Sequence, residues 1–262
     1  MSGNIQFHKY QGTGNDFVII DNRNGTVQLS NEQVAFLCDR KFGIGADGLM
    51  LLQNKAGYDF EMVYYNSDGK PSTMCGNGGR CLVKYANEVA GIRKNEYQFL
   101  AIDGPHQANI DFNGWVNLHM IDVTAIQNDG GDSVLNTGSP HFVKIVQDAA
   151  TYDVVRVGKL IRYADTYAKE GINVNFVERL SDDHIYVRTY ERGVEDETLS
   201  CGTGVTAAAL VMWHNDRGFN RVEVTTPGGN LAVEFDRIGD NSFNNIWLCG
   251  PATQVFTGTI QL

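Results

Sequence analysis

The sequence predicts an α+β fold of two pseudo-symmetric domains, each an antiparallel sheet or barrel wrapped around a central helix. Short alternating segments punctuated by glycine are typical of antiparallel strands. A four-residue pattern, Cys-Gly-x-Gly, occurs at residues 75–78 and again at residues 201–204, in opposite halves of the chain. A stretch predicted to be helical follows each copy. The repeated signature therefore indicates an internal duplication.

The first half contains a predicted hairpin, a helix and several strands. Residues 5–10 and 17–21 flank a glycine-rich turn, and residues 31–41 are predicted to form an amphipathic helix. Ser30 is its expected N-cap, because a serine hydroxyl accepts a hydrogen bond from the first helical turn. Strands are expected at residues 49–53 and 60–65 before the first cysteine helix, and near residues 98–102, 107–111 and 115–120 after it.

The second half repeats this order. Strands are expected near residues 142–146, 172–178 and 185–190 before the second cysteine helix, and at 221–225, 231–236 and 245–249 after it. The composition changes near residues 119–131, where a polar Asn-Asp-Gly-Gly-Asp run begins at position 128. We therefore expect one domain over residues 1–119, joined by the C-terminal tail 251–262, and a second over residues 120–250.

Composition excludes several classes of protein. The formal net charge of -10 argues against a nucleic-acid binder, which would carry a basic surface. No apolar run approaches the ~18 residues of a membrane-spanning helix, and the amino terminus lacks the pattern of a signal peptide. The chain has five cysteines, which is an odd number and a lower density than a disulfide framework requires. We expect reduced thiols, a cytoplasmic location and no membrane partner.

The two signature cysteines, Cys75 and Cys201, are candidate acid–base groups. A cysteine at a helix start lies beside free backbone N–H groups and the positive end of the helix dipole, which lower its pKa from about 8.5. Cys38, Cys81 and Cys249 lack this context and are expected to pack in the core. Neither copy has the Cys-x-x-Cys spacing of a zinc site, so no metal is expected.

Two such thiols suit the inversion of a carbon centre. If both helix starts point into a cleft between the domains, one thiolate removes a proton from a carbon acid and the opposite thiol returns one to the other face. The backbone N–H groups would hold the neighbouring carboxylate and stabilise its developing charge.

Several further motifs carry a resemblance to a known family. They are Gly-Thr-Gly-Asn-Asp-Phe at residues 12–17, Gly-Ile-Gly-Ala-Asp-Gly at 43–48, Asn-Ser-Asp-Gly at 66–69, and Glu-Arg-Gly at 191–193, ahead of the second signature. With both signatures in order, the chain resembles diaminopimelate epimerase nearly end to end. The resemblance implies cofactor-independent conversion of LL- to meso-diaminopimelate, in lysine and peptidoglycan precursor synthesis, and a homodimer as the expected assembly.

The resemblance also implies roles for particular residues. Cys75 would be the base for inversion of the LL form and Cys201 the acid, with His141 supporting their protonation states. Arg192 would hold the distal carboxylate of the substrate, and Glu191 would accept from an ammonium group. The expected catalytic residues are Cys75, Cys201, His141 and Glu191, and the expected substrate-binding residues are Asn15, Asn66, Gly76, Asn77, Asn173, Glu191, Arg192, Gly202 and Thr203.

Three positions depart from the family pattern. Ser139 replaces a commonly found asparagine before Pro140, and Gly48 replaces a glutamine that some members carry. Phe256 stands where a tyrosine associated with dimer contacts is frequent. The first two departures affect expected substrate contacts, and the third affects an expected dimer contact.

Other functions remain as alternatives. A proline racemase-like enzyme would use the same two thiols, but such enzymes tend to carry histidine where Asn77 stands. The phenazine-biosynthesis isomerase type lacks the cysteine pair. A thiol–disulfide redox protein or a non-catalytic amino-acid-binding module would use the site differently. The Gly-x-Gly-x-x-Gly match at residues 43–48 is not a nucleotide site, because a helix is expected before it and a strand after it.

Overall fold

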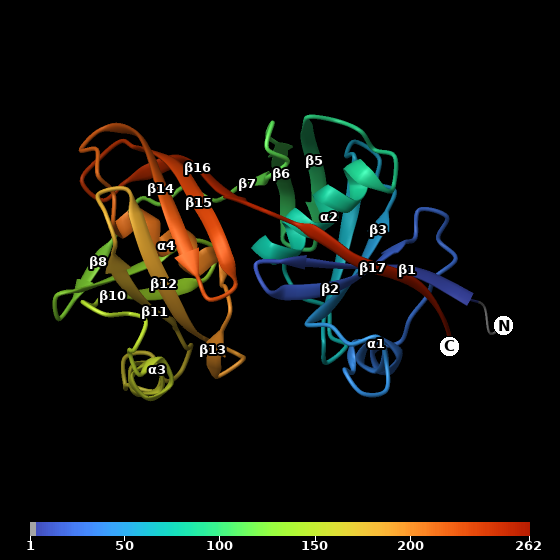
Figure 1. Cartoon of the computed structure of the whole chain (residues 1–262), viewed down its shortest axis with the longest axis horizontal. Coiled ribbons are helices and arrows are strands. Elements are labelled where there is room, and N and C mark those ends of the chain that lie inside the picture. The colour runs from blue at the N-terminus through green and yellow to red at the C-terminus, as the bar shows by residue number, and fades with distance from the viewer. Residues whose placement is uncertain (1–3) are drawn as a thin grey trace. The chain divides into compact units, whose positions relative to one another are not determined.

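Two β-α-β crossovers organise each of the two units of the chain. The computed structural model describes residues 4–262. One unit takes in the chain up to Leu118 together with Pro251–Leu262, and the other is His119–Gly250. Figure 1 shows helix α2 among the strands of the first unit and helix α4 among those of the second.

In the first unit, β1 and β2 form a hairpin, and helices α1 and α2 each connect two parallel strands. The pairs β2–β3 and β4–β5 are parallel, and β17–β1, β1–β2, β3–β4, β5–β6 and β6–β7 are antiparallel. The elements are β1 (Asn4–Gly12), β2 (Asn15–Asp21), α1 (Asn31–Cys38), β3 (Gly48–Gln53), β4 (Phe60–Asn66), α2 (Gly76–Glu88), β5 (Glu96–Ala101), β6 (Gly104–Ile110), β7 (Val116–His119) and β17 (Thr253–Gln261).

The second unit repeats this connectivity with helices α3 and α4. The pairs β10–β11 and β12–β14 are parallel, and β9–β10, β11–β12, β14–β15 and β15–β16 are antiparallel. The elements are β8 (Gln127–Asp129), β9 (Asp132–Asn136), β10 (Pro140–Ile145), α3 (Val154–Arg162), β11 (Asn173–Arg179), β12 (His184–Glu191), β13 (Asp196–Thr198), α4 (Gly202–Val211), β14 (Gly218–Thr226), β15 (Gly229–Arg237) and β16 (Phe243–Gly250).

These elements confirm the α+β class and the duplicated order, but the expectation of antiparallel sheets is wrong in one respect. Each unit holds a mixed sheet, because every helix carries the chain back along the sheet to the end where the preceding strand began. The next strand then runs parallel to the previous one. The alternating pattern of apolar residues does not distinguish the two kinds of pairing.

Helix α1 has the expected start and an earlier end than expected. Ser30 accepts from the Gln33 backbone N–H while the Gln33 side chain accepts from the Ser30 N–H, which is a capping box. The helix ends at Cys38 instead of residue 41. The chain turns back at Gly43, where a Cβ would lie 1.9 Å from the carbonyl oxygen of Phe36. The close approach of two backbone segments therefore fixes this end.

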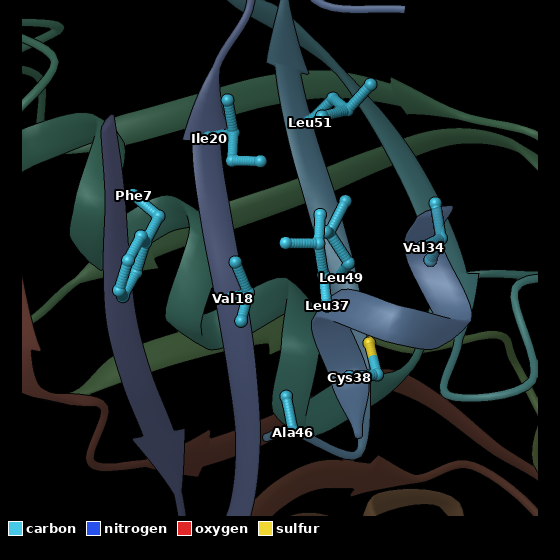
Figure 2. Packing of buried hydrophobic residues seen from close by; sticks show 9 residues of the cluster. All are labelled: Phe7, Val18, Ile20, Val34, Leu37, Cys38, Ala46, Leu49 and Leu51. Atoms are coloured by element: carbon cyan, nitrogen blue, oxygen red, sulfur yellow. The ribbon is translucent and has the colours of Figure 1, made fainter. Parts of the chain in front are cut away.

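The sheet of the first unit is buried between two helices. Figure 2 shows side chains of α1 packed on one face of strands β1–β3. On the other face, Gly78 of α2 lies close to Phe17 and Met50, since a Cβ there would be 3.4 Å and 3.3 Å from them. Buried strands with both faces covered are the usual result of β-α-β crossovers. The cluster on the α1 side contains Phe7, Val18, Ile20, Val34, Leu37, Cys38, Ala46, Leu49 and Leu51.

The second unit has the same layers. Helix α3 covers one sheet face through a cluster that includes Val154, Phe176 and Tyr190. Helix α4 is buried along almost its whole length, and three successive alanines keep it thin enough to be enclosed by strands. Helix α3 was not predicted from the sequence. No helix within residues 4–262 is long and apolar enough to cross a membrane.

A buried ion pair in the first unit links strand β1 to the start of strand β2. Lys9 is only 5% exposed, and its Nζ lies 2.7 Å from a carboxylate oxygen of Asp16. The more exposed Arg40 contacts the same carboxylate at 2.7 Å. Burial alone would raise the pKa of Asp16, but hydrogen bonds from Arg40 and Lys9 outweigh it and hold the pKa at about 2.

Substituting Asp16→Asn should lower the free energy of unfolding by about 3 kcal/mol, because it leaves the Lys9 ammonium buried without a carboxylate. Arg40→Gln retains the buried pair and should cost less than about 1 kcal/mol. Urea unfolding at pH 7 measures both changes. The folded pKa of Asp16 is below its unfolded value, so its contribution is present above about pH 4 and is lost toward pH 2. Equal losses in the two variants would contradict this account.

Candidate functional site

Both signature cysteines occupy the N-cap position of a helix, as expected. Cys75 precedes α2 and Cys201 precedes α4, each in an extended backbone conformation. The first hydrogen bonds of the two helices run from Gly79 N to Cys75 O and from Val205 N to Cys201 O. The backbone N–H groups before them, in the first turn, have no partner within the helix. Each thiol therefore lies beside an anion-binding helix terminus.

The Cys75 sulfur lies against the amide of Asn15. Its Sγ is 3.6 Å from Asn15 Oδ1, and Asn77 Nδ2 donates to the same oxygen at 3.3 Å. Asp47 fixes the orientation of this amide, because its carboxylate accepts from Asn15 Nδ2 at 2.5 Å. Asn15 consequently presents an acceptor to the Cys75 thiol. The structure thus brings together Cys75, Asn15 and Asn77, and adds Asp47 as the residue that orients Asn15.

A buried arginine holds the start of α2. Arg80 has no exposed surface, and its guanidinium donates to Gly76 O at 3.3 Å and Asn77 Oδ1 at 3.0 Å. It also donates to the hydroxyl of Thr13 at 3.3 Å. Thr13 has a positive φ of 51°, an uncommon conformation for a β-branched residue. Arg80 therefore ties the strained β1–β2 turn to the first turn of the cysteine helix.

Asn66 and Gly48 lie at the same end of the sheet. Gly48 pairs with Phe17 on β2 and with Asn66 at the end of β4. A Cβ at Gly48 would lie 2.5 Å from the ring of Tyr64 and 2.7 Å from Tyr65 O. The space that a glutamine side chain would start from is thus filled by the neighbouring strand. This explains the departure from the family pattern at position 48.

The Cys201 sulfur lies against a threonine–histidine pair. Its Sγ is 3.6 Å from Thr203 Oγ1, which is 2.9 Å from Nε2 of His141. His141 has no exposed surface, and burial together with the positive charge of Arg192 lowers its pKa to about 3. The imidazole is therefore neutral at physiological pH. It reaches Cys201 through the Thr203 hydroxyl.

Asn175 is the site residue of the second unit that the sequence did not reveal. Its Nδ2 lies 3.1 Å from Nδ1 of His141 and donates to Phe142 O at 3.0 Å. Thr189 donates to its Oδ1 at 2.9 Å. The sequence could have indicated Asn175 through its position two residues after Asn173 on a predicted strand, because side chains two residues apart lie on the same face of a strand.

Asn173, Ser139 and Arg192 form a second group. Asn173 Nδ2 donates to Ser139 Oγ at 2.9 Å, and Arg192 Nη2 donates to the same hydroxyl at 3.2 Å. Asn173 Oδ1 accepts from the Arg192 backbone N–H at 2.9 Å. Gly171 permits this packing, since a Cβ there would lie 2.6 Å from Arg192 Cδ. Ser139 therefore connects two expected substrate-binding residues.

Glu191 lies at the end of β12 and accepts from the Thr198 hydroxyl at 2.8 Å. Its neighbour Tyr190 pairs with Val174, the residue after Asn173. Glu191 is thus close in the sheet to Asn173, with its carboxylate held by β13.

The expected residues recur at equivalent places in the two units. Asn66 ends β4 and Glu191 ends β12, and each of these strands is the first of the parallel pair that a cysteine helix connects. His141 pairs with Asn173 at the start of a parallel strand pair, as Phe17 pairs with Gly48. The duplicated connectivity therefore gathers each half of the expected site at one end of its own sheet. The position of the site in a cleft between domains stays a prediction.

The other three cysteines are buried. Neither Cys38 nor Cys81 forms a disulfide bond. Burial raises the pKa of Cys38 to about 11 and that of Cys81 to about 12, so both are poor nucleophiles. Cys249 is 1% exposed. Residues 4–262 contain no cluster of three or more His, Cys, Asp or Glu side chains suited to a metal ion.

Solved structures of low sequence identity share this fold. A phenazine biosynthesis protein of the PhzF family from Bacillus anthracis aligns with a TM-score of 0.77 at 13% identity, covering 99% of this chain and 100% of that one. A hydroxyproline epimerase from Agrobacterium vitis aligns with a TM-score of 0.68 at 14% identity, covering 99% and 93%. At these identities the similarity establishes the fold.

Sequence comparison is more specific. A diaminopimelate epimerase of Flavobacterium psychrophilum is 50% identical over 259 residues, covering 98% of this chain and 100% of the relative. One of Chlorobaculum tepidum is 43% identical over 262 residues, covering 96% and 99%. The profile of the diaminopimelate epimerase family matches residues 7–124 and 133–255. The chain belongs to the diaminopimelate epimerase family.

Proposed function

We propose that this protein is an isomerase that interconverts LL- and meso-diaminopimelate, with Cys75 and Cys201 as its acid–base pair. Membership of the family over nearly the whole chain supports the substrate. The observation that carries the mechanism is the N-cap position of both signature cysteines, on helices α2 and α4. At these positions the helix terminus favours the thiolate and can bind the reacting carboxylate.

The reaction exchanges one proton for another. A thiolate takes the proton from the α-carbon, and the resulting negative charge spreads onto the carboxylate, where first-turn N–H groups stabilise it. The other thiol then donates its proton to the opposite face of the carbon. Atoms and charge balance, since one cysteine gains the proton that the other loses. The mechanism requires both sulfurs to reach one carbon from opposite faces. We assign the base for the LL form to Cys75 and the acid to Cys201.

The distal end of the substrate would be held in the second unit. Arg192 is exposed and already bound to the hydroxyl of Ser139, so a carboxylate can join the same donor group. Glu191 offers a carboxylate to the distal ammonium. A proline racemase-like enzyme is the alternative, but proline has no second charged end for this pair to bind.

Solvent exchange distinguishes these substrates. Reduced protein incubated with LL-diaminopimelate in D₂O should form the meso isomer with deuterium at the inverted α-carbon, as measured by NMR and mass spectrometry. Proline should show no exchange. Exchange of proline without exchange of diaminopimelate would favour the alternative, and exchange of neither would refute both.

Removal of either signature thiol should abolish inversion. Cys75→Ala and Cys201→Ala are each expected to lower kcat by at least about a thousandfold, because one proton-transfer group is lost. Cys249→Ala is the matched control, since it removes a buried thiol outside the site. The meso product is measured by chiral chromatography. Full activity in either signature variant would contradict the two-thiol mechanism.

Arg192→Ala should raise KM for diaminopimelate about ten- to a hundredfold, because a charge-assisted hydrogen bond to the distal carboxylate is lost. Arg156→Ala, which removes an exposed arginine of α3, serves as the control. Steady-state kinetics measures both. An unchanged KM in the Arg192 variant would remove this residue from the substrate site.

The two thiols also indicate the kind of cellular compartment in which the enzyme can work. A disulfide between Cys75 and Cys201 would consume both acid–base groups, so the enzyme needs a reducing compartment, and we place it in the cytoplasm. We expect a homodimer by analogy with the family, which light scattering of the purified protein would test.

A further inference from the structure

A continuous series of hydrogen-bonded side chains ends at the Cys201 sulfur. It runs from Thr189 through Asn175, His141 and Thr203 to Cys201, with successive heavy-atom separations of 2.9, 3.1, 2.9 and 3.6 Å. The first three of these residues are buried. Each link has a donor and an acceptor, so the direction of one link constrains the next.

The direction is fixed at Asn175. Its Nδ2 lies 3.0 Å from Phe142 O, and a backbone carbonyl can only accept. The amide must therefore place its nitrogen on this side and its oxygen toward the hydroxyl of Thr189. The second hydrogen of Nδ2 then points to Nδ1 of His141.

This arrangement selects one tautomer of His141. Because Nδ1 faces an N–H donor, it must be the unprotonated nitrogen of the ring. Burial and the charge of Arg192 lower the pKa of the imidazole to about 3, so the ring carries a single proton. That proton is on Nε2 and is donated to Thr203 Oγ1.

The tautomer in turn sets the direction of the Thr203 hydroxyl. A hydroxyl has one hydrogen and two lone pairs, and His141 occupies a lone pair. The hydrogen is then available to the Cys201 sulfur. With the opposite tautomer, His141 Nε2 would accept the hydroxyl hydrogen, and only a lone pair would face the sulfur.

We propose that Asn175 is a positioning residue of the epimerase: by selecting the His141 tautomer, it makes Thr203 a hydrogen-bond donor to Cys201 and so stabilises the thiolate form of that cysteine. This inference rests on the proposed function. Donation from Thr203 stabilises the Cys201 thiolate in either case, whether Cys201 starts as the base or becomes a thiolate after giving up its proton.

The first unit shows that packing alone does not require a carboxamide at this position. Met50 lies two residues after Gly48 on β3, as Asn175 lies two residues after Asn173 on β11. A Cβ at Gly78 would be 3.3 Å from the Met50 sulfur, and one at Gly204 would be 2.3 Å from Asn175 Oδ1. The two residues fill the same place against their cysteine helices. A polar side chain at Asn175 therefore has a reason other than filling space.

The tautomer can be observed in the unmodified protein. Two-bond ¹H–¹⁵N correlation spectra of protein labelled at histidine distinguish the tautomers, and His141→Gln assigns the signal among the six histidines. We expect His141 to be neutral and protonated on Nε2 between pH 5.5 and 8. The Nδ1-protonated or the doubly protonated form would overturn the proposal.

Alkylation measures the effect on Cys201 without substrate. Iodoacetamide at pH 7, followed by mass spectrometry of the Cys201 peptide, should react about tenfold more slowly with Thr203→Val than with the wild type. Thr203→Ser restores the hydroxyl and should react within about threefold of the wild-type rate. Thr225→Val is the matched control, because it removes the hydroxyl of another pair, at 2.9 Å from His184 Nε2. An unchanged Cys201 rate in Thr203→Val would overturn the proposal.

Kinetics then tests Asn175 itself. Asn175→Leu should lower kcat about ten- to a hundredfold, the effect of a hydrogen bond to a charged group, with KM changed less than about threefold. A raised KM with unchanged kcat would overturn the positioning role. If the wild type fails to epimerise diaminopimelate while the spectra and alkylation agree with expectation, the proposed function fails and the Asn175–His141–Thr203 geometry stands.

Discussion

The site depends on one topological constraint: each cysteine helix is also the crossover between two parallel strands. A crossover helix begins near the end of the strand that precedes it. The start of α2 therefore follows the end of β4, where Asn66 lies, and the start of α4 follows β13, which pairs with the end of β12 where Glu191 lies. Most residues of both helices are buried, so the positions of Cys75 and Cys201 are tied to the packing of these helices against the surrounding strands.

The same scaffold carries different polar groups in its two halves. Asp47 turns the Asn15 amide so that its oxygen faces Cys75. In the second unit, the thiol of Cys201 meets the Thr203 hydroxyl. The backbone therefore supplies the shared property, a helix terminus beside each thiol, and neighbouring strands supply what differs. In the proposed mechanism the two cysteines hold opposite protonation states, and their different polar neighbours fit that difference.

The sequence was sufficient for much of this arrangement. The capped start of α1, both N-cap cysteines and most strands were predicted correctly, because caps, glycine turns and alternation are local signals. Helix α3 was missed: it contains β-branched valines and Gly158, where a Cβ would lie 2.5 Å from Tyr190. That glycine serves a tertiary contact at the expense of helix propensity. Parallel pairing and the role of Asn175 depend on which strands become neighbours, which no local pattern records.

Gly48 has a consequence for how this chain can change. Its missing side chain is matched by the Tyr64 ring and by the Tyr65 carbonyl, both within 3 Å of where a Cβ would stand. A glutamine introduced there meets a filled space, and loss of the Tyr64 ring would still leave the Tyr65 carbonyl oxygen 2.7 Å from its Cβ. A larger residue at position 48 therefore requires a shift of the backbone of β4 as well as a change at position 64.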